Sequence, residues 1–272
     1  MSIIQSIILG LIQGLTEFLP VSSSGHLVLA KSFMNINTGN DVSFEVFVHF
    51  GTFLSVVMIF WKDISEMYKV FAQAINHPSK ISEMYRTNEM FRLMVFVIIG
   101  CIPAGILGVM FDEFFEEMFS DPKLISEMLL ITGLILFLSR FAKQSRDGNV
   151  TLTSSFGIGC VQAVAILPGV SRSGSTISAA LMMGVSQENA ARFSFLMALP
   201  IIFGATLLKT RHLIISPPPS GQLVTMAIGT LVAFISGYIA IKALTGILRR
   251  GKFSFFAYYC FVVGILGILF IS

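Results

Sequence analysis

Charged residues are scarce in this 272-residue chain, and cysteines are few. Only 12% of the residues are Asp, Glu, Lys or Arg, whereas a soluble domain carries about 25%. The net charge of +3 is small and dispersed, and no basic run is interleaved with aromatic residues, so nucleic acid is not expected as a partner. The three cysteines stand singly in apolar segments without metal-site or disulfide spacing, and we interpret them as packing residues.

Apolar residues dominate instead, at 54% of the chain with a mean hydropathy of +0.83, which predicts an integral membrane protein. The first apolar run contains Gln13 and Glu17 and lacks the basic start and cleavage site of a signal peptide, so we expect it to stay in the mature protein. Most runs have the roughly 20-residue length of a membrane-spanning helix. They cover residues 3–19, 43–61, 91–110, 124–142, 154–168, 190–208, 222–245 and 253–271.

Two of these runs break into a similar polar cluster. Residues 20–26 read PVSSSGH and residues 169–176 read GVSRSGST. The longer stretches that start at Gly10 and Gly159, laid over each other without a gap at an offset of 149 residues, share seven identities. These are Gly10/Gly159, Gln13/Gln162, Val21/Val170, Ser22/Ser171, Ser24/Ser173, Gly25/Gly174 and Ala30/Ala179. The match indicates an internal repeat, an architecture in which two interrupted helices often build one site near mid-bilayer.

The expected fold is therefore all-α, a single membrane domain over residues 1–272 with halves 1–148 and 149–272. Each half would contain one re-entrant helical hairpin and three full spans, because the apolar stretch after the first break is too short to cross. An odd number of crossings per half turns the second half upside down. The sequence thus predicts an inverted repeat whose hairpin tips meet.

Loop charges predict the orientation. One side collects most basic loop residues, and the positive-inside rule makes that side cytoplasmic. Both termini and the mouth of the first hairpin would then face outward. Lys209 and Arg211 are exceptions on the outer side. The basic residues assigned to the cytoplasmic side are Lys62, Lys69, Lys80, Arg86, Arg92, Arg140, Lys143, Arg146, Arg249, Arg250 and Lys252.

Ionisable residues inside spans indicate function, because a charge at the bilayer centre costs about 2.5–3.5 kcal/mol. Glu17, His26, Glu45 and Arg172 stand out, and His49 follows Glu45 by one helical turn. For Glu45 and His49 an interfacial position at the headgroups stays open. For Arg172 the alternative is a structural ion pair with Glu17.

The two breaks also predict an anion site. Helix N-termini at residues 22–25 and 171–174 would offer unpaired N–H groups, and Arg172 adds a planar fork of donors suited to phosphate. Glu17 and Glu45 would repel phosphate unless Mg²⁺ or Ca²⁺ lies between, so these two are the expected metal ligands. A metal-dependent phosphatase follows as the reaction class, with His26 three residues after Ser23 and able to serve as general base or to protonate the leaving group.

Residues 13–26, QGLTEFLPVSSSGH, and residues 168–176, PGVSRSGST, closely resemble the two signatures of bacterial undecaprenyl-diphosphate phosphatases, the bacitracin-resistance family. The resemblance covers nearly the whole chain. It implies a multi-pass enzyme of the bacterial plasma membrane that removes the terminal phosphate of a polyprenyl diphosphate and recycles the carrier lipid for peptidoglycan. It further implies roles for single residues. Gln13 and Glu17 would position metal or pyrophosphate, Ser23 would be the nucleophile with His26 its partner, and Ser171, Arg172, Ser173 and Thr176 would grip the diphosphate.

Two other classes of membrane protein share some of these features. Lipid phosphatases of the acid-phosphatase type share a Ser-Gly-His element, but Ser178 stands here where they need a histidine. A transporter or lipid flippase could use the same repeat and anion site without cleaving its lipid. The sequence leaves open whether a phosphoserine or a metal-activated water carries the reaction, which cation serves, how the lipid tail enters and whether the protein forms a homo-oligomer.

Overall fold

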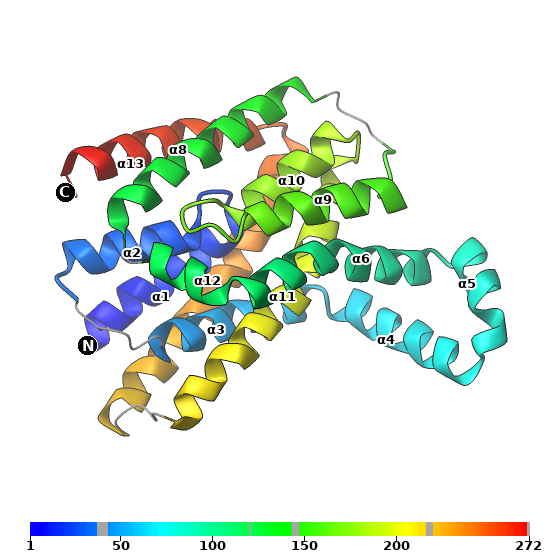
Figure 1. The fold of residues 1–272 in the computed structure, drawn as a ribbon, viewed down its shortest axis with the longest axis horizontal. Coiled ribbons are helices and arrows are strands. Elements are labelled where there is room, and N and C mark those ends of the chain that lie inside the picture. Colours follow the sequence, from blue (N-terminus) through cyan, green and yellow to red (C-terminus); the bar gives the residue numbers. More distant parts are fainter. Residues whose placement is uncertain (37–42, 120, 143–146, 216–219, 271–272) are drawn as a thin grey trace.

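The computed structural model describes residues 1–36, 43–119, 121–142, 147–215 and 220–270, and every regular element in those ranges is a helix (Figure 1). Of residues 116 and 210–215 it describes the backbone alone. The helices are α1 (Ile3–Phe18), α2 (Ser23–Phe33), α3 (Ser43–Ile59), α4 (Trp61–Asn76), α5 (Ile81–Thr87), α6 (Glu89–Met110), α7 (Asp112–Met118), α8 (Pro122–Leu138), α9 (Leu152–Val164), α10 (Arg172–Met182), α11 (Gln187–Ile215), α12 (Leu223–Arg249) and α13 (Phe256–Phe270). Single turns of 3₁₀ helix lie at Pro78–Lys80, Ser139–Phe141, Ser220–Gln222 and Phe253–Phe255.

Five helical segments among the described residues are long and apolar enough to cross a membrane, and the number rises to six if α3 and α4 count as one bent span. The five are Glu89–Met110, Pro122–Phe141, Gln187–Lys209, Leu223–Arg249 and Phe253–Phe270. The prediction of an all-α, multi-pass membrane protein is therefore confirmed.

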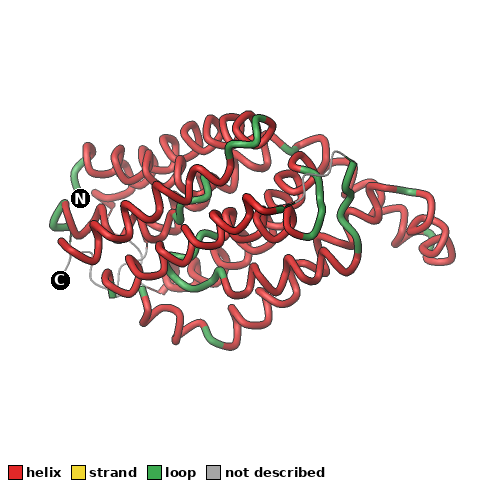
Figure 2. The backbone as a smooth tube through the Cα atoms, turned by 90° about the horizontal axis from the view of Figure 1, so that it is seen from above, coloured by secondary structure: helices red, strands yellow, loops and turns green. Residues whose placement is uncertain are grey.

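The segment after α3 differs from the prediction. The sequence predicts a loop between the runs 43–61 and 91–110. In the structure the chain bends by 78° after α3 and continues as the helices α4 and α5, which project at the end of the molecule opposite the two termini (Figures 1 and 2). Val70 and Ala74 of α4 are buried against Phe91 of α6, whereas Tyr68 and Phe71 stay exposed. An amphipathic helix with one buried stripe is harder to recognise in the sequence than a continuous apolar run, and for this reason α4 was not predicted as a helix.

Both sequence breaks separate short helices. α1 ends at Phe18, and α2 begins after Ser22, whose φ is 69°. In the second half, α9 ends at Val164 and α10 begins after Ser171. None of these four helices reaches the roughly 20 residues that a crossing of the hydrocarbon core requires.

The first helix of each half packs closely on a long helix of the other half. A Cβ on Gly10 of α1 would lie 2.6 Å from the carbonyl oxygen of Gly229 on α12, and a Cβ on Gly159 of α9 would lie 2.4 Å from that of Gly100 on α6. Gly10 and Gly159 are matched residues of the internal repeat. Small residues allow such backbone approach between membrane helices, so the same device joins the halves at two equivalent places.

We expect Gly159→Ala to lower the free energy of unfolding by about 1–3 kcal/mol, because the added methyl group must push α9 away from the α6 backbone. Gly105→Ala is the matched control, since a Cβ at Gly105 has nothing within 4 Å. Thermal unfolding of both variants in detergent measures the difference. Equal unfolding temperatures for Gly159→Ala and the wild type would show that the close α6–α9 approach does not exist.

Candidate active site

The two breaks in the chain are in contact. A Cβ on Gly174 would lie 3.2 Å from Cβ of Pro20. The Ser173 hydroxyl donates to the carbonyl of Leu19 at 3.3 Å, and the N–H of Gly169 donates to Ser24 Oγ at 3.4 Å. The polar clusters that the sequence predicts to converge therefore do so, within the interior of the helix bundle (Figure 1).

Each break ends in a capped helix N-terminus. Ser22 Oγ accepts from the N–H of Gly25 at 3.3 Å, and Ser171 Oγ accepts from the N–H of Gly174 at 3.1 Å. Both capping serines are buried. The caps fix the start of α2 and of α10, so two positive dipole ends lie at the junction of the breaks, where they favour an anion.

Glu17 and Arg172 form an ion pair at this junction. Arg172 Nη2 donates to Glu17 Oε1 at 2.7 Å, and the two side chains are 14% and 7% exposed. The other carboxylate oxygen accepts from Ser23 Oγ at 2.6 Å and from Gln13 Nε2 at 3.0 Å. Four of the predicted site residues from α1, α2 and α10 thus share one hydrogen-bonded cluster.

Two polar atoms of this cluster lack a partner. Arg172 Nη1 and Gln13 Oε1 are buried and make no hydrogen bond with the described part of the protein. A buried donor or acceptor without a partner costs about 1–3 kcal/mol, so such atoms need an explanation. A bound phosphate oxygen would accept from Arg172 Nη1, and a cation bound with it would interact with Gln13 Oε1.

The other predicted substrate-binding residues of the second half, Ser171, Ser173 and Thr176, form hydrogen bonds to backbone groups. Thr176 Oγ1 donates to the carbonyl of Arg172 at 2.8 Å and lies 2.7 Å from Ser194 Oγ. Ser171 caps α10, and the Ser173 hydroxyl reaches the first break. These contacts orient Arg172, which is the group that faces Glu17.

Thr132 of α8 is a site-supporting residue that the sequence analysis missed. Its hydroxyl donates to the carbonyl of Gly169 at 2.9 Å and accepts from the N–H of Ser171 at 3.0 Å. Gly169 has a φ of +89°, a conformation that side chains rarely adopt, and a Cβ there would meet the Ile125 carbonyl oxygen at 2.4 Å. The available signal was a hydroxyl at the centre of the apolar run 124–142, where Ser126 and Ser139 lie nearer the ends.

His26 does not bond to Ser23 in this structure. Its Nδ1 donates to the carbonyl of Ser22 at 2.8 Å, and its Nε2 lies 2.8 Å from the hydroxyl of Tyr259 on α13. The two rings are stacked with centroids 5.6 Å apart. Because a carbonyl only accepts, Nδ1 carries a proton, and Nε2 of a neutral ring accepts from Tyr259. Tyr259 is a second residue that the sequence analysis missed.

His49 lies at the cluster from the side of α3. Its Nε2 is 3.8 Å from Glu17 Oε2, and its Nδ1 lies 2.8 Å from the carbonyl oxygen of Glu45. His49 therefore lies beside Glu17, within reach of the polar cluster. Glu45 pairs through Oε1 with Lys31 of α2, and its Oε2 is buried without a hydrogen-bond partner.

The expected cation ligands differ in whether their oxygens are available. No group of three or more His, Cys, Asp and Glu side chains among the described residues could hold a metal alone. Mg²⁺ is commonly bound by one or two carboxylates together with substrate phosphates. Of the expected ligands, Gln13 Oε1 and Glu45 Oε2 are buried oxygens without a hydrogen-bond partner, whereas both oxygens of Glu17 already accept hydrogen bonds from Arg172, Ser23 and Gln13.

Fold and site together define a multi-pass helical membrane protein with a buried cluster of hydrogen-bonded polar side chains at the junction of two chain breaks. Comparison with known families agrees, since the family model described as "Bacitracin resistance protein BacA" matches residues 6–266. The chain belongs to this family. The resemblance drawn from the two motifs is therefore confirmed.

Curated relatives cover almost the full length. A protein of Salinibacter ruber is 42% identical over 265 residues, which are 97% of this chain and 97% of the relative. One of Halothermothrix orenii is 41% identical over 273 residues, 99% and 98% of the two chains, and one of Syntrophotalea carbinolica is 44% identical over 268 residues, 97% of each. All three are named undecaprenyl-diphosphatase.

Proposed function

We propose that this protein hydrolyses undecaprenyl diphosphate to undecaprenyl phosphate and inorganic phosphate in the bacterial plasma membrane, recycling the lipid carrier for cell-wall synthesis and conferring resistance to bacitracin. The relatives are named undecaprenyl-diphosphatase, and this name gives the reaction. The observation in this chain that carries it is the buried Arg172, which pairs with Glu17 through one nitrogen while Nη1 has no partner. That donor is available to a phosphate oxygen between two helix N-termini.

The hydrogen bonds of Glu17 support a role for Ser23 as nucleophile. Ser23 Oγ donates to Glu17 Oε2 at 2.6 Å, so its lone pairs are directed away from the carboxylate. When a phosphate takes over the donors of Arg172, Glu17 loses its cationic partner and becomes a better acceptor for the Ser23 proton. Ser23 Oγ then attacks the terminal phosphorus, the bond from that phosphorus to the bridging oxygen breaks, and undecaprenyl phosphate leaves.

Hydrolysis of the resulting phosphoserine completes the cycle. Water attacks the phosphorus of the Ser23 ester while His26 takes the water proton, and Glu17 returns to Ser23 Oγ the proton that it took in the first step. Inorganic phosphate leaves and carries away the proton held by His26. His26 would have to give up its contact with Tyr259 to act here. Ser22, Ser171, Ser173 and Thr176 keep the two helix starts and Arg172 in place around the transferred group.

A divalent cation, Mg²⁺ or Ca²⁺, would be held by Glu17, Glu45 and the Gln13 amide oxygen. It would offset the repulsion between these carboxylates and the diphosphate and polarise the phosphoryl oxygens. We expect EDTA to remove nearly all phosphate release and an excess of Mg²⁺ or Ca²⁺ to restore it. Full activity of metal-stripped protein in chelator would refute the cation requirement and leave Arg172 as the charge that neutralises the substrate.

An inverted repeat of re-entrant hairpins is the architecture that we propose around this site. The paired glycine contacts of α1 on α12 and of α9 on α6 support it, because they relate equivalent residues of the halves. The short helices on both sides of each break support the re-entrant paths. In this arrangement both termini and the mouth of the first hairpin face outward, where the diphosphate is exposed after polymer transfer.

Phosphate release from purified protein tests the proposed function. In detergent with farnesyl diphosphate or a longer homologue and Mg²⁺ or Ca²⁺, we expect inorganic phosphate at a rate that follows protein concentration. A lipid flippase, which the repeat architecture also favours, would release none. Absence of phosphate release from every isoprenoid diphosphate, with the protein folded and the cation present, would overturn the proposal.

A further inference from the structure

A second feature of the molecule is an apolar groove between α3 and α11. Its volume is about 330 Å³, and Val46, Phe47, Phe50 and Phe53 of α3 face Phe203 and Leu207 of α11 across it. Three of these rings form a continuous aromatic wall, with centroids 6.2 Å apart for Phe50 and Phe53 and 5.9 Å apart for Phe53 and Phe203. Phe50, Phe203 and Leu207 are exposed, so the groove opens on the outer surface of the helix bundle.

The groove begins beside the anion site. His49 lies on α3 between the groove residues Val46 and Phe53, at spacings of three and four residues that share one helix face. Its Nε2 is 3.8 Å from Glu17 Oε2. The α11 side of the groove packs along the same helix, because α3 and α11 are in contact and the rings of Phe53 and Phe203 lie 5.9 Å apart. A ligand with a charged head at Glu17 and Arg172 can therefore continue into the groove past His49.

We propose that the groove between α3 and α11 binds the first isoprene units of the substrate, those next to the diphosphate. This inference rests on the proposed function. A polyprenyl diphosphate joins a polar head, which needs the buried donors, to an apolar chain, which must leave the protein into the bilayer. The flat, branched isoprene units match an aromatic wall through close van der Waals packing.

The groove orients the chain rather than supplying a large binding energy. Lipid tails are as apolar as the groove, so the chain gains packing contacts but little hydrophobic free energy on moving from the bilayer into it. Chain packing would hold the terminal phosphorus near Ser23 and keep the bridging oxygen on the far side. The groove between Val46 and Phe53 extends about 10 Å along α3, so it would contact only the isoprene units that fit within this length.

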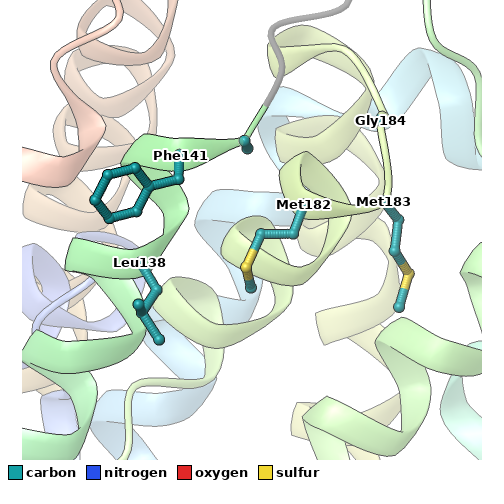
Figure 3. Close-up of a pocket in the computed structure, with 6 residues that line it drawn as sticks. Leu138, Phe141, Met182, Met183 and Gly184 are labelled. Atoms are coloured by element: carbon teal, nitrogen blue, oxygen red, sulfur yellow. The ribbon is translucent and has the colours of Figure 1, made fainter.

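A larger groove at another place is the main competitor. It has a volume of about 500 Å³ and lies between the end of α8 and the end of α10, where Leu138, Phe141 and Met182 face it (Figure 3). Met182 is ten residues after Arg172 on α10, which separates the two by about 15 Å along the helix. A chain whose diphosphate lies at Arg172 cannot place its first units there.

Filling the α3–α11 groove tests the inference. We expect Leu207→Trp to lower kcat for farnesyl diphosphate by about fivefold with KM changed little, because the chain no longer orients the terminal phosphorus. Hydrolysis of isopentenyl diphosphate, which is too short to use the groove fully, should be much less affected. Leu208→Trp is the matched control, because Leu208 is a similarly exposed leucine on α11 that does not line the groove. Equal changes of kcat in the two variants would overturn the inference, whereas a wild type without activity would overturn the proposed function.

Photocrosslinking provides a readout that does not depend on turnover. A non-hydrolysable diphosphonate with a benzophenone in its second isoprene unit is irradiated with the wild-type protein, and the labelled peptides are sequenced. Labels within residues 46–53 or 203–207 support the inference. Labels within residues 138–142 or 182–184, or labels spread over all exposed apolar helices, contradict it.

Discussion

Arg172→Lys lowers kcat/KM for isoprenoid diphosphates by about a thousandfold. Lysine keeps the positive charge beside Glu17 but cannot present two coplanar donors, so the phosphate loses the contact that Nη1 of Arg172 would make. Loss of one preorganised donor to the reacting group costs about 10²–10³ in rate. Phosphate release over a range of substrate concentrations, with the cation held constant, measures the effect.

Lysine is preferred to alanine because removing one partner of a buried ion pair costs about 3–5 kcal/mol and endangers the fold. Arg192→Lys is the matched control. Arg192 of α11 pairs with Asp63 of α4 in another arginine–carboxylate contact that is more exposed. We expect this variant to retain wild-type turnover. An Arg172→Lys protein with normal unfolding temperature and normal activity would exclude Arg172 from the phosphate site.

Ser23→Ala abolishes the phosphoenzyme and lowers kcat by at least about a thousandfold, if Ser23 is the nucleophile. The expected intermediate is a phosphoserine at residue 23, which rapid acid quenching with substrate labelled in the terminal phosphate traps. Peptide mapping should place the label on Ser23 rather than on Ser22 or Ser24, because the Ser23 hydroxyl donates to Glu17.

Ser24→Ala serves as the control, since Ser24 Oγ contacts Ser22 Oγ and the N–H of Gly169 rather than Glu17. This variant should keep the labelled intermediate and most of the turnover. Wild-type kcat in Ser23→Ala would contradict covalent catalysis and assign the attack to a water molecule that the bound cation activates.

The Glu17–Arg172 contact could be predicted from the sequence although 155 residues separate the partners. Both are ionisable residues within or beside membrane-length apolar runs, and a buried charge needs a partner. Glu17 and Arg172 also lie beside the two matched breaks of the repeat, which reduces the number of possible partners for each. The same breaks predicted helix N-termini at residues 22–25 and 171–174, and α2 and α10 begin there.

Other parts of the site could not be read from the chain. Whether the Thr132 hydroxyl bonds within its own helix or to a neighbouring one depends on the rotation of α8, which apolar patterning on a membrane helix leaves undetermined. The contact of His26 with Tyr259 depends in the same way on where α13 packs. Spacing placed His26 near Ser23, but spacing does not fix the side-chain rotamer, and the ring turns to Tyr259 instead.

A structure of the protein with a non-hydrolysable isoprenoid diphosphonate and Mg²⁺ tests the central claim most directly. The account predicts both phosphonate groups at the junction of the two breaks, with an oxygen within hydrogen-bonding distance of Arg172 Nη1 and the terminal phosphorus next to Ser23 Oγ. A headgroup bound elsewhere, with the Glu17–Arg172 pair unchanged from the ligand-free protein, would contradict it.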